Sequence, residues 1–161
     1  MKLDKILVPL DGSMLAEAAL SAACDFAARD GATISLLRAA EAMPRPGGDV
    51  VEAQVTAVRE AEEYLASIVR RLADRRITRV ETHVWYGPPA AAIVEAAAVQ
   101  KADLIVMSTH GRSGLGRLVL GSVAESVLRG TTAPILVVRA DHAPVDAPRG
   151  AGQATAGGAR V

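Results

Sequence analysis

The chain has 161 residues, half of them apolar and 2% aromatic, and its 18 basic residues balance its 18 acidic ones. This length fits one domain with some additional terminal sequence. A neutral chain has no bulk attraction to nucleic acid or to an anionic membrane, so neither is expected as a partner. The single cysteine, Cys24, excludes a disulfide framework and is expected as a buried thiol.

Short apolar runs that predict buried strands alternate along the chain with helical patterns. The predicted strands cover residues 6–8, 34–37, 80–85, 104–106 and 135–138. The predicted helices cover residues 13–29, 50–74, 88–99 and 122–130. The third strand alternates apolar and polar residues, which is typical of a strand at a sheet edge.

Local signals mark where these helices begin and end. Ser13 is a suitable N-cap for the first helix. Proline suits the first turn of a helix, so the pair at 88–89 predicts the start of the third. Ser122 and Glu125 form a capping-box pattern that predicts Ser122 as the N-cap of the fourth helix, which Gly130 would close.

Strands that alternate with helices predict an α/β domain, with a five-stranded parallel sheet and helices on both faces. Such sheets bind ligands beyond the carboxyl ends of their strands. In this chain those ends fall at residues 9–12, 38–39, 86–87 and 108–111.

Two segments do not fit the alternation. The Pro- and Gly-rich residues 41–49 predict a loop that could flank or cover a ligand. Residues 1–140 are expected to form the domain, and residues 141–161, which lack periodicity, to form a disordered tail. No apolar run approaches the roughly 18 residues that span a membrane, and no signal peptide is visible. We therefore expect a cytoplasmic protein.

Residues 107–122 form the segment with the strongest chemical character. Glycines at 111, 114, 116 and 121 allow backbone N–H groups to approach a phosphate closely. The start of the following helix adds N–H donors and a positive dipole end, and His110, Arg112 and Arg117 add further donors. The segment predicts a polyphosphate site, with an ordinary Gly-rich loop as the alternative.

Two familiar phosphate motifs nearly match and fail. Gly111 and Gly116 have the P-loop spacing, but Arg117 and Leu118 replace the required lysine and hydroxyl residue. The Rossmann order of glycines is absent as well. The segment is therefore expected to hold phosphates rather than to cleave them.

Asp11 and His110 are further candidates. A carboxylate at Asp11 could accept hydrogen bonds from ribose hydroxyls or approach a phosphate-bound metal, or it could be a turn residue, since Asp-Gly is common in turns. His110 is expected to donate to phosphate or to be merely exposed, because no nucleophile elbow accompanies it. Trp85 and Tyr86 are expected to pack rather than to stack on a base.

Four segments together resemble the universal stress protein (UspA) family. They are residues 5–13, 103–107, 121–125 and 133–138. ATP-binding members of that family share a Gly-x2-Gly-x9-Gly-Ser/Thr signature. Its last three positions are Gly111, Gly121 and Ser122 here, while Ser108 replaces the first glycine.

The resemblance implies a Rossmann-like, adenine-nucleotide α-hydrolase-like sheet with strand order 3-2-1-4-5. It implies a homodimer paired through the last strand, Ile135 to Arg139. It also implies an adenine and ribose site near Pro9, Asp11 and Ala39, and a triphosphate on the segments that follow the fourth strand and begin the fourth helix. The expected nucleotide-binding residues are Pro9, Leu10, Asp11, Ala39, Gly87, Met107, Ser108, Thr109, His110, Gly111, Arg112, Ser113, Gly114, Gly121, Ser122, Val123 and Ala124.

The leading functional hypothesis is a stress-response regulator or nucleotide-dependent switch that binds ATP or another adenine nucleotide without substantial turnover. Mg²⁺ or Mn²⁺ would be held mainly by the phosphates, with no catalytic residue and no metal ligand from the protein. One alternative is a dimeric interaction protein that binds no nucleotide, which Ser108 would favour. The other is a slow ATPase or nucleotidyl transferase that uses His110 and Asp11.

Overall fold

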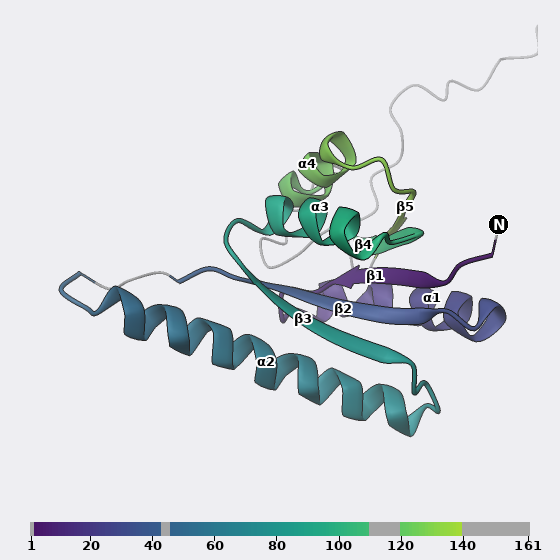
Figure 1. Ribbon diagram of the computed structural model, residues 1–161, viewed down its shortest axis with the longest axis horizontal. Helices are drawn as coiled ribbons and strands as arrows, with labels where there is room; N and C mark the ends of the chain where they lie inside the picture. The colour runs from purple at the N-terminus through teal and green to yellow at the C-terminus, as the bar shows by residue number, and fades with distance from the viewer. Residues whose placement is uncertain (1, 43–45, 110–119, 140–161) are drawn as a thin grey trace, which may run out of the picture.

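The computed structural model describes residues 2–42, 46–109 and 120–139. In chain order its elements are β1 (Lys5–Pro9), α1 (Met14–Asp30), β2 (Thr33–Ala40), α2 (Val50–Asp74), β3 (Val80–Tyr86), α3 (Pro89–Gln100), β4 (Leu104–Ser108), α4 (Ser122–Gly130) and β5 (Ile135–Val138) (Figure 1). The predicted elements are all present in the predicted order. The predicted tail boundary and tail lie outside the described residues, so both stay predictions.

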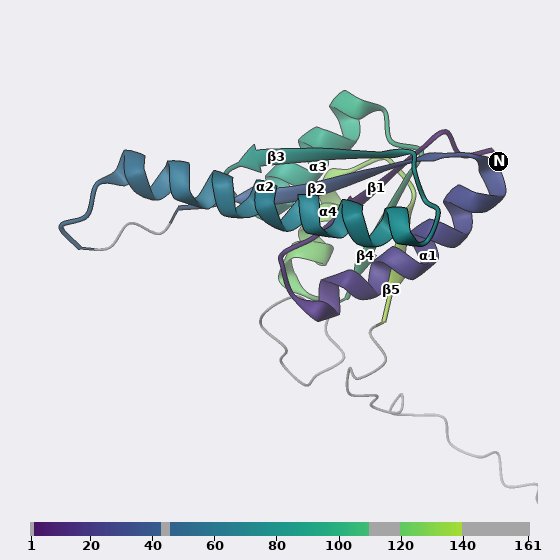
Figure 2. The ribbon, with the colours of Figure 1, turned by 90° about the horizontal axis from the view of Figure 1, so that it is seen from below.

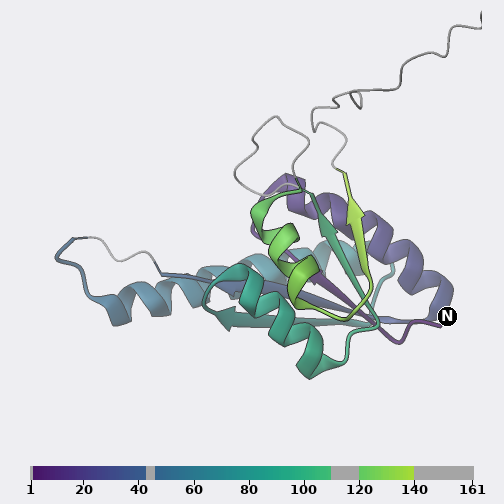
Figure 3. The same ribbon diagram turned by 90° about the horizontal axis from the view of Figure 1, so that it is seen from above.

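The five strands form one parallel sheet in the order β3-β2-β1-β4-β5, as predicted. Helices α1 and α2 lie side by side on one face (Figure 2), and α3 and α4 cover the other (Figure 3). β3 and β5 are the two edge strands, which confirms the edge position expected for the third strand. In the part of the chain that the structure describes, no helix is both long and apolar enough to cross a membrane.

The central strand β1 is buried on both faces, which explains its unbroken apolar sequence. Ile6 and Val8 join the core beneath α1 and α2, whereas Leu7 joins the core beneath α3 and α4. Alanines along α1 and α3 let both helices pack closely on the sheet. Cys24 is buried in the first of these cores, as expected.

Of the two predicted N-cap residues, the structure confirms one and corrects the other. Ser13 is the N-cap of α1, and its Oγ accepts a hydrogen bond from the Ala16 backbone N–H at 3.1 Å. Ser122 is not an N-cap: Gly121 occupies that position, and Ser122 is the first helical residue. The reason is tertiary, because the Gly121 N–H donates to the Thr109 carbonyl at 3.0 Å and so fixes the helix start against the end of β4.

Helix α2 is longer than the sheet it covers. Its buried residues are Ala61, Leu65, Ile68 and Leu72, which run from the middle of the helix toward its C-terminus. The N-terminal part runs out past the strands (Figure 1), and its valines at 50, 51 and 55 are 55%, 67% and 62% exposed. Asp49 caps this end by accepting from the Val51 and Glu52 backbone N–H groups.

The contact between Gly121 and β4 predicts a large cost for Gly121→Ala. An ideal Cβ at residue 121 would lie 2.7 Å from the Thr109 carbonyl oxygen, a backbone atom that cannot move alone. We expect a loss of about 1–3 kcal/mol in the free energy of unfolding, measured by urea denaturation.

Gly130→Ala is the matched control at the other end of the same helix. Its Cβ would meet a Val94 methyl group at 3.0 Å, and this side chain can move aside. A Gly121→Ala protein as stable as the control would contradict the proposed role of the Thr109 contact.

Candidate functional site

The switch in strand order lies between β1 and β4. The chain leaves β1 toward α1 on one face of the sheet and leaves β4 toward α4 on the other (Figures 2 and 3). The register pairs Ile6 with Leu104 and Leu7 with Ile105, so the segments that follow both strands reach the same carboxyl edge. Ligand sites of open parallel sheets form at this position.

The β1 side of this edge is a tight turn. Pro9 ends the strand, and the buried Leu10 donates its N–H to the Leu37 carbonyl at 2.8 Å. Asp11 Oδ1 accepts from the backbone N–H of Ser13 at 2.8 Å and from its Oγ at 2.6 Å. One oxygen of Asp11 therefore has the turn role that was the alternative to ligand binding.

On the β4 side, a backbone hydrogen bond holds the start of α4 against the end of the strand. Met107 and Ser108 are the last two strand residues, and both are buried. Thr109 donates its N–H to Val138 and accepts from Gly121, each at 3.0 Å, so it links β5, β4 and α4. This arrangement directs the first N–H groups of α4 toward the carboxyl edge, where the dipole favours an anion.

Ser108 has ordinary strand geometry. It pairs with Val138 in the ladder and is not among the described residues with positive φ. The conformational freedom of glycine is therefore not needed at this position.

Of the other residues expected to bind the nucleotide, some lie in the described part of the chain and some do not. Ser122 is exposed, Val123 is half-buried and Ala124 is buried, all in the first turn of α4. Ala39 lies near the end of β2, and Gly87 follows β3, where its N–H donates to Ala40 at 3.0 Å. The remaining predicted residues, His110, Gly111, Arg112, Ser113 and Gly114, lie outside the described part of the chain.

Strand β2 extends farther than its apolar run predicts, from Leu37 to Ala40. This extension places the half-buried Arg38 in the strand, beside the β1 turn. Its guanidinium lies so close to Gly12 that an ideal Cβ there would be 2.5 Å from Nη1. Arg38 was predicted at the carboxyl end of this strand, without a role in the site, and its charge at the end of an apolar run was the sequence signal for it.

The guanidinium of Arg38 also lies over the ring of Tyr64, 4.8 Å from its centroid. Tyr64 belongs to α2, and its hydroxyl donates to Glu17 Oε1 of α1 at 3.0 Å. Burial and the Glu17 carboxylate raise the pKa of Tyr64, so the hydroxyl keeps its proton and remains a donor. Arg71 Nη2 meets the other oxygen of Glu17 at 2.8 Å. No sequence motif indicated this network.

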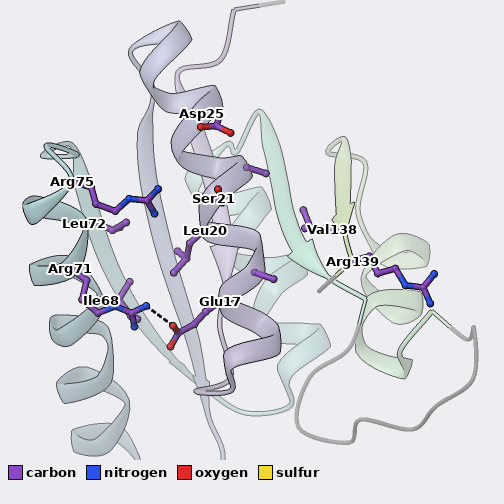
Figure 4. A pocket seen from close by; sticks show the side chains of 12 residues that line it. Glu17, Leu20, Ser21, Asp25, Ile68, Arg71, Leu72, Arg75, Val138 and Arg139 are labelled. Atoms are coloured by element: carbon purple, nitrogen blue, oxygen red, sulfur yellow. Dashed lines mark ion pairs between the residues drawn. The ribbon is translucent and has the colours of Figure 1, made fainter. Parts of the chain in front are cut away.

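Two hollows among the described residues lie away from the β1–β4 edge. One, of about 470 Å³, lies over α1 and is lined from α2 and the end of β5 (Figure 4). The Glu17–Arg71 ion pair crosses it. The other, of about 480 Å³, lies beside the start of α2 and is lined by Glu41, Asp49, Glu52 and Glu60 among others. Neither contains a residue expected to bind nucleotide, so we place the candidate site by strand topology.

Within the described ranges, no group of three or more His, Cys, Asp or Glu side chains could hold a metal ion. His83 lies in β3 near Glu81, with 3.7 Å between Nε2 and Oε2.

Comparisons with known proteins agree with this architecture. The model of the universal stress protein family matches residues 2–139. A universal stress protein of Methanocaldococcus jannaschii is 34% identical over 138 residues, which are 84% of this chain and 81% of that protein.

Two solved structures extend the comparison. The universal stress protein UspA from Lactobacillus plantarum is 26% identical, with a TM-score of 0.76 and coverage of 86% of this chain and 99% of that one. A universal stress protein in complex with cAMP is also 26% identical, with a TM-score of 0.57 and coverage of 86% and 98%. The family model and the relative that is 34% identical therefore show that the chain belongs to the universal stress protein family.

Proposed function

We propose that this protein binds an adenine nucleotide at the carboxyl edge between β1 and β4, as a cytoplasmic stress-response regulator. The observation that carries the proposal is the contact of Gly121 with Thr109, which brings the N-terminus of α4 to the switch in strand order. A helix N-terminus at that position suits a phosphate group. The similar protein in complex with cAMP supports an adenine nucleotide as the ligand.

We further propose ATP, with Mg²⁺ or Mn²⁺ on its phosphates, as the physiological ligand. The last three positions of the Gly-x2-Gly-x9-Gly-Ser/Thr signature support this choice. The extended conformation of Ser108 supports it too, because a serine there needs no strained backbone. The nucleotide would act as a ligand rather than as a substrate, since the lysine and hydroxyl residue of a P-loop are replaced by Arg117 and Leu118.

A backbone contact at this site indicates how nucleotide binding would affect a homodimer. Thr109 donates to Val138 of the edge strand β5, so the site and this edge share a residue. Val137 on β5 is 36% exposed. An edge strand presents backbone groups that can pair with another chain. We propose a homodimer paired through β5, whose geometry nucleotide binding would alter.

Isothermal titration of the full chain with ATP, AMP and cAMP, with and without Mg²⁺, tests the binding proposal. We expect binding of at least one of these nucleotides. Ser122→Glu should weaken it about tenfold or more, because a carboxylate at the start of α4 opposes a phosphate.

Ser126→Glu is the matched control, since Ser126 is also exposed and lies one turn farther along α4. It should leave the affinity nearly unchanged. Absence of binding at millimolar nucleotide with Mg²⁺ would refute the proposal and favour an interaction protein without nucleotide.

Val137→Lys tests the dimer. A charge on this edge strand should shift the protein from dimer to monomer in sedimentation-equilibrium experiments. Val99→Lys is the control, because Val99 is 72% exposed at the far end of α3. A wild-type protein that is monomeric, or a Val137→Lys dimer as tight as the wild type, would exclude pairing through β5.

A further inference from the structure

We propose that Arg38 makes this site selective for adenine nucleotides that carry a phosphate monoester on the ribose 2′ or 3′ oxygen. This inference rests on the proposed nucleotide site between β1 and β4. It adds a contact on the β2 side of that site, built by Arg38, Gly12 and Tyr64.

The first support is the fit between Arg38 and the turn after β1. The guanidinium lies against the backbone of Gly12, where an ideal Cβ would be 2.5 Å from Nη1. Gly12 has a φ of +86°, which side chains also disfavour. Glycine at this position therefore leaves the space that the guanidinium occupies, beside Asp11.

The second support is that Arg38 is held in a fixed orientation. Its guanidinium lies 4.8 Å from the centroid of the Tyr64 ring. The Tyr64 hydroxyl is held in turn by Glu17 at 3.0 Å. A planar guanidinium fixed on a ring is well suited to bidentate recognition of phosphate.

The third support is the charge around Arg38. Two carboxylates lie near this region, Asp11 in the turn after β1 and Glu17 on α1. Glu17 is balanced by Arg71 at 2.8 Å, and Asp11 Oδ1 accepts two hydrogen bonds from Ser13. A guanidinium has five N–H donors and is always charged, so one arginine can contact the protein and an added anion at the same time.

The fourth support is the order of the strands, which decides where on the nucleotide the phosphate must be. β4, β1 and β2 are neighbours in the sheet, and adjacent strands lie about 4.8 Å apart. In the proposed binding mode the 5′-phosphates lie at α4 and the ribose lies at Asp11, so a phosphate on the 2′ or 3′ oxygen would lie on the β2 side. In dinucleotide-binding folds, an arginine near the ribose-binding acid accommodates a 2′-phosphate.

Isothermal titration of the full chain with three ligands tests the inference: AMP, adenosine 2′,5′-bisphosphate and adenosine 3′,5′-bisphosphate. We expect one or both bisphosphates to bind wild type at least about tenfold more tightly than AMP. The ligand with the higher affinity identifies which oxygen carries the phosphate.

Arg38→Met should abolish this preference and change the affinity for AMP by less than about threefold. Arg38→Lys, which keeps the charge without the planar group, should retain part of the preference. Tyr64 is a positioning residue, so Tyr64→Leu should reduce the preference for the bisphosphates. Tyr64→Phe keeps the ring under Arg38 and should retain that preference. Arg70→Met is the matched control, since it removes an exposed arginine of α2 and leaves the contacts among Arg38, Tyr64, Glu17 and Arg71 in place.

Equal affinity of wild type for AMP and both bisphosphates would overturn the inference and leave the proposed function standing. An Arg38→Met protein that loses AMP and bisphosphate binding in equal measure would also overturn it, because Arg38 would then be structural. Wild type that binds none of these ligands or ATP would refute the proposed function itself. Circular dichroism of each variant verifies its folding.

Discussion

The parallel pairing of β1 with β4 is the contact on which the rest of the arrangement depends. It joins segments that are about a hundred residues apart in sequence and places the change of crossover direction at the centre of the sheet. On one side of this pair the chain turns to α1, and on the other to α4. Because of this divergence, a turn with a carboxylate and a helix N-terminus both lie at the carboxyl edge of the sheet. Without the pairing, Asp11 and Gly121 would belong to unrelated surfaces.

Most of the fold could be predicted from the sequence because its signals are local. Alternating apolar runs predicted every strand and helix, and the family resemblance predicted the strand order. Ser13 was predicted correctly because an N-cap depends on the residues next to it. Ser122 was predicted wrongly because the start of α4 depends on a contact with Thr109. Thr109 lies outside the few residues that a capping motif includes, so the motif could not indicate this contact.

The candidate site was predictable on its β1 and β4 sides and not on its β2 side. Asp11 and Ser108 were predicted at the carboxyl ends of strands, so their type and position were informative. Arg38 and Tyr64 meet only because α2 crosses the end of β2 at one particular point along the helix. Periodicity shows that α2 has a buried face, but it does not show which turn of the helix reaches the sheet edge. A contact between residues of two different elements therefore required the structure.

The part of α2 that runs past the sheet has a consequence for local dynamics. Its first turns bury no side chain completely, so their stability comes from helix propensity and the Asp49 cap rather than from the core. Such a segment opens at a small fraction of the free energy of global unfolding, and its amide hydrogens exchange before those of the strands. The buried residues begin at Ala61, one turn before Tyr64. Opening of the exposed turns can therefore stop short of Tyr64, which separates local unfolding at the tip of α2 from the contact between Arg38 and Tyr64 at the sheet edge.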